Sequence, residues 1–173
     1  LIALVAHPSA SVRIEALARI AATNSLDALP AVQGLLRDTD SLVRGAAIRA
    51  YCALGRDRSI RVSSTFLADA DPVVRASAIT ALIRHGGLDG ILMAAEALKA
   101  LMSHEGAIER LCAAKIFGEI KVRNFYQPVM SLLGDENAKV RLAAIEAAGE
   151  MQSSELVAPL IYKLASPDTA PTA

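Results

Sequence analysis

Apolar and polar residues recur along this chain with the period of an α-helix. Around residue 75, for example, apolar side chains fall at Val74, Ala78, Ile79 and Leu82, a spacing that gathers them on one helix face. A polar residue able to cap a helix precedes each of five such segments, namely Ser9, Asp40, Asp71, Gly106 and Asn137. A second apolar segment follows each of them. The pattern therefore predicts an all-α chain built from helical hairpins.

An internal repeat organises these hairpins. One arginine marks each repeat, and these marker arginines are evenly spaced except for a longer third interval: Arg13, Arg44, Arg75, Arg110 and Arg141. An alanine stands three residues after each marker arginine, and Asp or His stands six residues before it. Repeats of this kind stack into solenoids, because one unit cannot bury its apolar face alone. We therefore predict an α-solenoid (α-α superhelix) of about five helical hairpins.

The register of the repeat predicts the boundaries. Residues 1–164 are expected to form one repeat domain, with a remnant helix at 1–6 and repeats at about 7–37, 38–68, 69–103, 104–134 and 135–165. Four extra residues near Gly86, Gly87 and Gly90 should lengthen the second helix of the third repeat or its loop. We expect Gly55 and Gly86 to take left-handed C-cap conformations. Residues 166–173 are expected to be a disordered tail or linker, and the chain, which starts at Leu1, to be part of a larger protein.

Composition narrows the function classes. The chain has 173 residues, is 53% hydrophobic with 34 alanines, and carries 18 basic and 18 acidic residues. A zero net charge disfavours nucleic acid, since basic excess supplies most non-specific affinity. No apolar run reaches the roughly 18 residues of a spanning helix, so no direct membrane insertion is expected. Cys52 and Cys112 fall in Ala-rich helices and are expected to be buried reduced thiols, which favours a cytoplasmic location.

The repeats resemble those of the HEAT-repeat superfamily, which is of the armadillo type. They are most similar to the short HEAT-like repeats found in phycobilin lyases and many bacterial proteins. Two segments carry the likeness, Asp69-Ala-Asp-Pro-Val-Val-Arg75-Ala-Ser-Ala-Ile-Thr-Ala-Leu and Asp135-Glu-Asn-Ala-Lys-Val-Arg141-Leu-Ala-Ala-Ile-Glu-Ala-Ala-Gly149. The resemblance implies a helical scaffold and does not specify an activity.

The resemblance also implies an Asp–Arg ladder between successive repeats. Carried onto this sequence, its members are Asp38, Asp69 and Asp135 with Arg44, Arg75 and Arg141. His7 and His104 replace Asp in the first and fourth repeats, so the acidic charge is lost there, although a neutral imidazole can still accept a hydrogen bond. The alternative is that the arginines form a phosphate-binding stripe, as in HEAT-like DNA glycosylases.

No catalytic, metal or cofactor site is predicted. His104-Glu105 resembles one of the His-Glu pairs of deoxyhypusine hydroxylase, but a single pair does not define an iron coordination sphere, and we interpret it as a turn before a helix. The Gly86-Gly87-Leu-Asp-Gly90 stretch lacks the lysine of a phosphate loop. The chain is therefore expected not to be an enzyme and to need no cofactor.

The second helices are expected to carry the partner surface. Positions two, six and nine before the last leucine of each second helix should point away from the core. The resemblance implies that this face is concave and often binds the partner. The candidate contact residues on it are Arg58, Arg61, Glu96, Gln127 and Tyr162.

The leading hypothesis is a non-catalytic scaffold that binds a protein partner or another domain of its own parent chain. Solenoids suit this role because they offer an extended surface of repeated units. Two alternatives rest on resemblance alone: a bilin lyase or chaperone-type subunit, and a soluble regulatory domain fused to a membrane transporter or signalling protein. Nucleic-acid binding is a further alternative, which the neutral charge disfavours.

Overall fold

The structure is a computed structural model that describes residues 1–165. The chain divides into two compact units, Leu1–Leu98 and a second that begins at Lys99. Every regular element in residues 1–165 is an α-helix or a 3₁₀-helix. The sequence expected residues 166–173 to be a tail or linker, and these lie outside the described part.

The first helix of each hairpin begins where the capping residues predict. These helices are α1 (Ala10–Ala22), α3 (Ser41–Gly55) and α5 (Pro72–His85) in the first unit, and α7 (Ala107–Ile120) and α9 (Ala138–Met151) in the second. The carboxylates of Asp40 and Asp71 and the amide oxygen of Asn137 accept backbone N–H bonds from the first turn. Such bonds satisfy donors that have no partner inside the helix. The five predicted start positions are therefore confirmed.

The second segments are less regular than single helices. In the first unit they run as η2 (Leu26–Ala28), α2 (Leu29–Gly34) and η3 (Leu35–Arg37), then as η4 (Arg56–Ser59), α4 (Ile60–Ser63) and η5 (Ser64–Ala68). In the second unit they are η6 (Arg123–Phe125) with α8 (Tyr126–Leu132), and η7 (Ser154–Leu156) with α10 (Val157–Leu164). The third repeat differs, because its four extra residues extend α6 (Gly87–Met102) to 16 residues.

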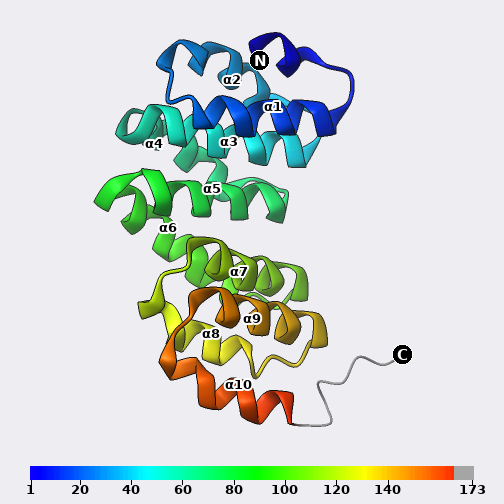
Figure 1. Cartoon of the computed structure of the whole chain (residues 1–173), viewed down its shortest axis with the longest axis vertical. Helices are drawn as coiled ribbons and strands as arrows, with labels where there is room; N and C mark the ends of the chain where they lie inside the picture. Colours follow the sequence, from blue (N-terminus) through cyan, green and yellow to red (C-terminus); the bar gives the residue numbers. More distant parts are fainter. Residues whose placement is uncertain (166–173) are drawn as a thin grey trace. The chain divides into compact units, whose positions relative to one another are not determined.

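Small residues set the distance between the first helices. In the first unit α3 packs between α1 and α5, and in the second α7 packs against α9 (Figure 1). The alanine three positions after each marker arginine is at most 1% exposed in all five repeats: Ala16, Ala47, Ala78, Ala113 and Ala144. A Cβ at Gly118 would lie 3.2 Å from the Cα of Ala147, so α7 and α9 approach backbone to backbone there. Tight packing of this kind leaves little room for larger side chains.

Aromatic side chains add little to this packing. Phe117 is 1% exposed and lies against the half-buried Phe125, with ring centroids 5.8 Å apart. Phe66 is half-buried and packs on the core of the first unit. The aliphatic and alanine side chains therefore provide most of the buried surface.

The predicted glycine C-caps are wrong by one residue. Gly55 has φ −84° and Gly86 has φ −90°, whereas a positive φ occurs at the residue after each, Arg56 at φ 47° and Gly87 at φ 55°. Gly86 is instead required by close packing, since a Cβ there would lie 2.8 Å from the carbonyl oxygen of Leu82. Leu82 O already accepts the Gly86 N–H bond, so the tight turn into α6 needs glycine for space.

The N-terminal segment is a short 3₁₀-helix. It is η1 (Ile2–Ala6), and it packs against α1 and α2. Leu1, which precedes it, and Ile2 and Leu4 on it are 43–55% exposed. The interpretation of residues 1–6 as the end of a second helix stays a prediction, because one 3₁₀ turn does not by itself reveal a missing partner.

Candidate functional site

Each repeat closes the turn before its first helix with the same hydrogen bond. The side chain six residues before the marker arginine accepts the backbone N–H two residues later. Asp38, Asp69 and Asp135 accept through Oδ1 at 2.8–2.9 Å, and His7 and His104 accept through Nδ1 at 3.1 and 2.9 Å. Histidine therefore replaces aspartate in this turn without loss of the local bond.

Each marker arginine donates hydrogen bonds from its helix to the backbone of that turn. In all five repeats, Nη1 donates to the backbone carbonyl oxygens of the residues six and five positions before, at 2.7–3.2 Å. Two carbonyl acceptors use the whole hydrogen-bonding capacity of that nitrogen, which has two hydrogens. The guanidinium is thereby held in one orientation relative to its own repeat.

Three marker arginines also reach the aspartate of the next repeat. Arg13 Nη2 donates to Asp38 Oδ1 at 3.0 Å, and its Nε lies 2.9 Å from Asp38 Oδ2 at an angle too bent for a hydrogen bond. Arg110 donates from Nε and Nη2 to both oxygens of Asp135, at 2.7 and 3.1 Å. Arg44 comes only within 3.9 Å of Asp69. The contacts thus join Arg13–Asp38, Arg44–Asp69 and Arg110–Asp135, and these three pairs are the Asp–Arg ladder as the structure has it.

The Arg110–Asp135 pair makes the shortest ion-pair contact of the three. The side chains of Arg110 and Asp135 are 11% and 7% exposed, and Arg110 also pairs with Glu136 at 2.9 Å. Hydrogen bonds from Arg110 hold the pKa of the Asp135 carboxyl below its usual value, against the effect of burial, with further help from the Asn137 N–H. The same contacts raise the pKa of Arg110. The pair is therefore ionised at neutral pH.

The ladder implied by the family resemblance does not include Arg13 and Arg110, although these two arginines make the short pairs. Both follow a turn in which His replaces Asp, and the resemblance implies a ladder only where Asp is present. Each arginine pairs with the aspartate that follows it, so a histidine before it has no bearing on its own pair. Arg75 and Arg141 make the same carbonyl bonds and further interactions. The signal available in the sequence was the aspartate that stands 25 residues after Arg13 and again after Arg110.

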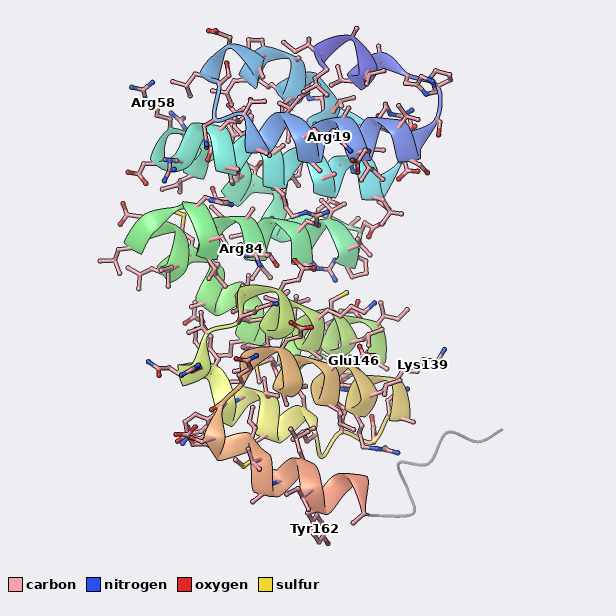
Figure 2. All side chains as sticks on the ribbon, in the orientation of Figure 1. Arg19, Arg58, Arg84, Lys139, Glu146 and Tyr162 are labelled. Carbon is pink, nitrogen blue, oxygen red and sulfur yellow. The ribbon has the colours of Figure 1, made fainter. Side chains whose placement is uncertain are left out.

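The five candidate contact residues on the second helices are all exposed. Arg58, Arg61, Glu96, Gln127 and Tyr162 lie on η4, α4, α6, α8 and α10, and Tyr162 is 72% exposed. Figure 2 shows the side chains of Arg58 and Tyr162 directed away from their helices. The structure brings Arg58 and Arg61 together on consecutive turns of one segment and distributes the others over separate helices.

An open groove lies in the first unit. Its volume is about 620 Å³, and it lies between the second segments of the first two repeats. We call it the α2–α4 groove; its walls are Pro30, Gln33, Gly34, Leu36, Arg37, Val62, Thr65 and Phe66. Three of these are positions that the sequence pattern places on the outward face: Pro30, Gly34 and Thr65. The groove itself was not predicted, because it depends on which side chains face each other across two repeats.

Exposed apolar residues also gather on the first half of α6. Leu88 and Leu92 are 73% and 61% exposed, and Ile91 and Met93 are 40% and 47% exposed. This segment contains the four extra residues of the third repeat. Glu96 on the same helix is a predicted contact residue, whereas Leu88 and Leu92 lie outside the predicted set.

The predicted turn histidine is exposed, and the two cysteines are buried. His104 accepts the Gly106 N–H and lies 3.5 Å from Glu109 Oε2, in a turn before α7. Cys52 and Cys112 are buried free thiols, and burial raises the pKa of the Cys52 thiol despite a contact with Ser63. Within residues 1–165, no three His, Cys, Asp or Glu side chains come together as metal ligands. No helix among the described residues is both long enough and apolar enough to cross a membrane.

Each repeat is a helical hairpin with a buried alanine in its first helix and one hydrogen-bonded turn before that helix. A series of such hairpins defines an α-solenoid. A family model of HEAT repeats matches residues 1–83 and 94–172. The chain therefore belongs to the HEAT-repeat family. The unmatched residues 84–93 include the inserted turn and the exposed leucines of α6. No curated protein matches the chain.

Proposed function

We propose that this chain is a non-catalytic interaction scaffold whose second-helix surface binds a protein partner or another domain of its parent chain. The observation that carries the proposal is the α2–α4 groove, an open and largely apolar site beside exposed charged residues on the second segments. HEAT repeats generally mediate protein–protein interaction. Binding sites combine an apolar centre with a polar rim in the same way.

We propose a structural role for the marker arginines rather than a phosphate-binding one. Their Nη1 atoms are fully used by backbone carbonyls. In the two short pairs the rest of the guanidinium faces a carboxylate. A phosphate would have to displace an acidic partner from a largely buried position, which is electrostatically unfavourable.

The buried free thiols support a reducing, cytoplasmic setting for the chain. Cys52 and Cys112 lie on different helices, α3 and α7, and each is buried. Cytosolic proteins keep such thiols reduced. This placement is part of the proposal.

Photo-crosslinking in the native host tests the binding face. A photoreactive phenylalanine analogue is placed at Glu96, Gln127 or Tyr162 on second helices, and at Arg19 or Glu146 on first helices as matched exposed controls (Figure 2). We expect the second-helix positions to give discrete crosslinked products that the first-helix positions do not. Equal or stronger products from Arg19 and Glu146 would assign binding to the opposite face and overturn the proposal.

A further inference from the structure

The α2–α4 groove has two exposed positions of α2, Pro30 and Gly34, in its wall. A Cβ built on Gly34 has no neighbouring atom within 4 Å, and Gly34 has φ −58° and ψ −35°. Any L-residue can adopt that conformation, so the backbone does not require glycine here. The space beside Gly34 is therefore open volume that a bound group could fill.

The groove offers apolar contact at its centre. Leu36 is 5% exposed, and Val62 and Phe66 are half-buried beside it. The hydroxyl of Thr65 already donates to the carbonyl of Val62 at 2.7 Å, so its hydrogen is not available to a ligand. Burial of an apolar side chain against these residues contributes roughly 25 cal/mol per Å². The centre of the groove is suited to an aliphatic or aromatic side chain.

One arginine, Arg37, lines the groove. Two more, Arg61 and Arg58, lie about one and two turns before Thr65 on the segment that forms the facing wall. Leu26–Arg37 and Arg56–Ala68 together contain four arginines and two aspartates, although the whole chain is neutral. Among residues 1–165, neither Arg37, Arg58 nor Arg61 has an ion-pair partner.

Because the groove is open to solvent, it is better suited to a peptide than to a small-molecule ligand. Small-molecule sites bury about 70–90% of their ligand, whereas this groove is open to solvent. A peptide can place one side chain in the groove and continue along the exposed second segments on either side. A nucleic acid would need several more phosphate contacts than three arginines provide, and its backbone has no use for the apolar centre.

We propose that the α2–α4 groove binds an acidic peptide segment, with an apolar side chain seated beside Gly34 and carboxylates paired with Arg37, Arg58 and Arg61. This inference rests on the proposed scaffold function and names the chemistry of the partner. Electrostatic complementarity of this kind sets orientation and association rate, and the apolar contact sets most of the affinity.

Selection from a displayed library of random dodecapeptides tests the proposal on the full chain. We expect the enriched peptides to carry net negative charge and at least one bulky apolar residue. One enriched peptide is then labelled, and its binding is measured by fluorescence anisotropy at low and moderate salt. Binding should weaken as salt rises, because screening reduces the attraction between exposed charges.

Two variant pairs locate the site. Gly34→Leu places a side chain in the open volume, beginning from a Cβ that has no neighbour within 4 Å, and should weaken binding more than tenfold. Gly149→Leu is the control, since Gly149 also has no neighbour within 4 Å of its Cβ. Arg61→Glu should weaken binding several-fold, whereas Lys139→Glu, an equivalent charge reversal on α9 (Figure 2), should leave it unchanged. Circular dichroism on all four variants monitors folding.

Several outcomes would overturn the groove as an acidic-peptide site. These are enrichment of basic or uncharged peptides, no enrichment above an unrelated protein, displacement of the peptide by a single-stranded oligonucleotide at equal concentration, or full binding by folded Gly34→Leu. Peptides that bind but respond to changes at Gln127 and Tyr162 would overturn the groove and leave the scaffold function standing. The scaffold function fails separately, in the crosslinking experiment.

Discussion

At each marker arginine, one guanidinium nitrogen closes the turn before its own helix, and the remaining nitrogens are directed to the next repeat where a pair forms. Arg110 shows the full arrangement, with two carbonyl bonds, two bonds to Asp135 and one to Glu136. Hydrogen bonds to charged groups are stronger than neutral ones. A single residue therefore fixes both the local turn and the spacing of two repeats.

Two rungs of the Asp–Arg ladder make a matched test of its contribution. Asp135→Asn and Asp69→Asn both keep an oxygen for the N–H two residues on, but only Asp135 has close ion-pair contacts. We expect Asp135→Asn to lower the melting temperature more than Asp69→Asn, as measured by circular dichroism. Equal losses from the two variants would show that the ion pair contributes nothing beyond the turn.

The Asp135 pair also predicts a dependence on pH. Because Arg110 holds the folded-state pKa of Asp135 below 3.8, the pair stabilises the fold fully above that value, and the contribution is lost as pH falls through the folded-state pKa. The stability difference between the native chain and Asp135→Asn, measured in urea, should therefore be largest near neutrality and shrink below about pH 3.8. If the stability difference between the two proteins is the same at every pH, the Arg110–Asp135 ion pair does not stabilise the fold.

His85 gives a second dependence on pH in a different window. Burial, followed by repulsion from Arg84 and Arg56, lowers the pKa of His85 from 6.5 in the folded chain. The unfolded chain binds a proton near pH 6.5 and the folded chain does so only at lower pH, so stability is lost as pH falls through this range. As the pH is lowered from about 7.5 to 5.5, we expect the free energy of unfolding of His85→Gln, measured in urea, to fall less than that of the native chain. The other two histidines, His7 and His104, are present in both proteins, so the difference between the profiles comes from His85. Parallel pH profiles for the two proteins would refute this.

At the level of single residues the sequence predicted the capping positions and the exposure of the contact candidates, because both follow from local periodicity. It left Arg13 and Arg110 out of the Asp–Arg ladder. The pairing of Arg110 with Asp135 spans 25 residues, and local pattern does not reveal which neighbour a side chain turns toward.

The helices of each hairpin are limited by small residues at their contacts. Ala78 is fully buried on α5, where that helix packs against α3. Lengthening its side chain forces neighbours from their rotamers in a close-packed interior. The size of this position, rather than its hydrophobicity, is therefore the constraint.

Ala78→Leu tests that constraint directly. We expect a loss of about 1–3 kcal/mol in the free energy of unfolding, because three added heavy atoms have no space at a fully buried position of the first unit's core. Ala95→Leu, at an exposed position of α6, should change stability by less than about 0.5 kcal/mol. The free energy of unfolding of both variants is measured by urea denaturation. If Ala78→Leu leaves it unchanged, the repeat register is misplaced.

Element boundaries were predicted at their starts better than at their ends. A capping side chain bonds to the backbone within its own turn, so its chemistry is visible in the sequence. The ends depended on tertiary packing. Gly86 is needed for its closeness to Leu82 O, and the left-handed residue is the next one, Gly87. The breaks of the second segments into 3₁₀ and α turns had no comparable signal.

At the scale of the whole chain, the zero net charge conceals a local asymmetry. Much of the charge is paired within the fold, as in the pairs of Arg13 and Arg110, and the second segments of the first two repeats keep a basic excess. Composition could therefore not indicate the α2–α4 groove. That groove requires glycine, proline and aromatic positions from two repeats to face each other, which only the packed hairpins bring about.

Repeats that contact only their neighbours should also respond locally to damage. Stability in such arrays is approximately a sum of repeat and nearest-neighbour terms. Gly118→Leu would place a side chain against the backbone of Ala147 and push α7 from α9, at a cost of about 1–3 kcal/mol. Gly149→Leu, on the open side of α9, provides the control for a leucine added to the same unit.

Hydrogen–deuterium exchange read by mass spectrometry measures where the loss falls. We expect Gly118→Leu to speed amide exchange in α7 and α9 and to leave α1 and α3 at native rates, because local opening needs only the weakened interface to separate. Gly149→Leu should leave all four helices unchanged. Faster exchange throughout the chain for Gly118→Leu would show that the described helices open as one cooperative unit, and the nearest-neighbour account of this solenoid would then be wrong.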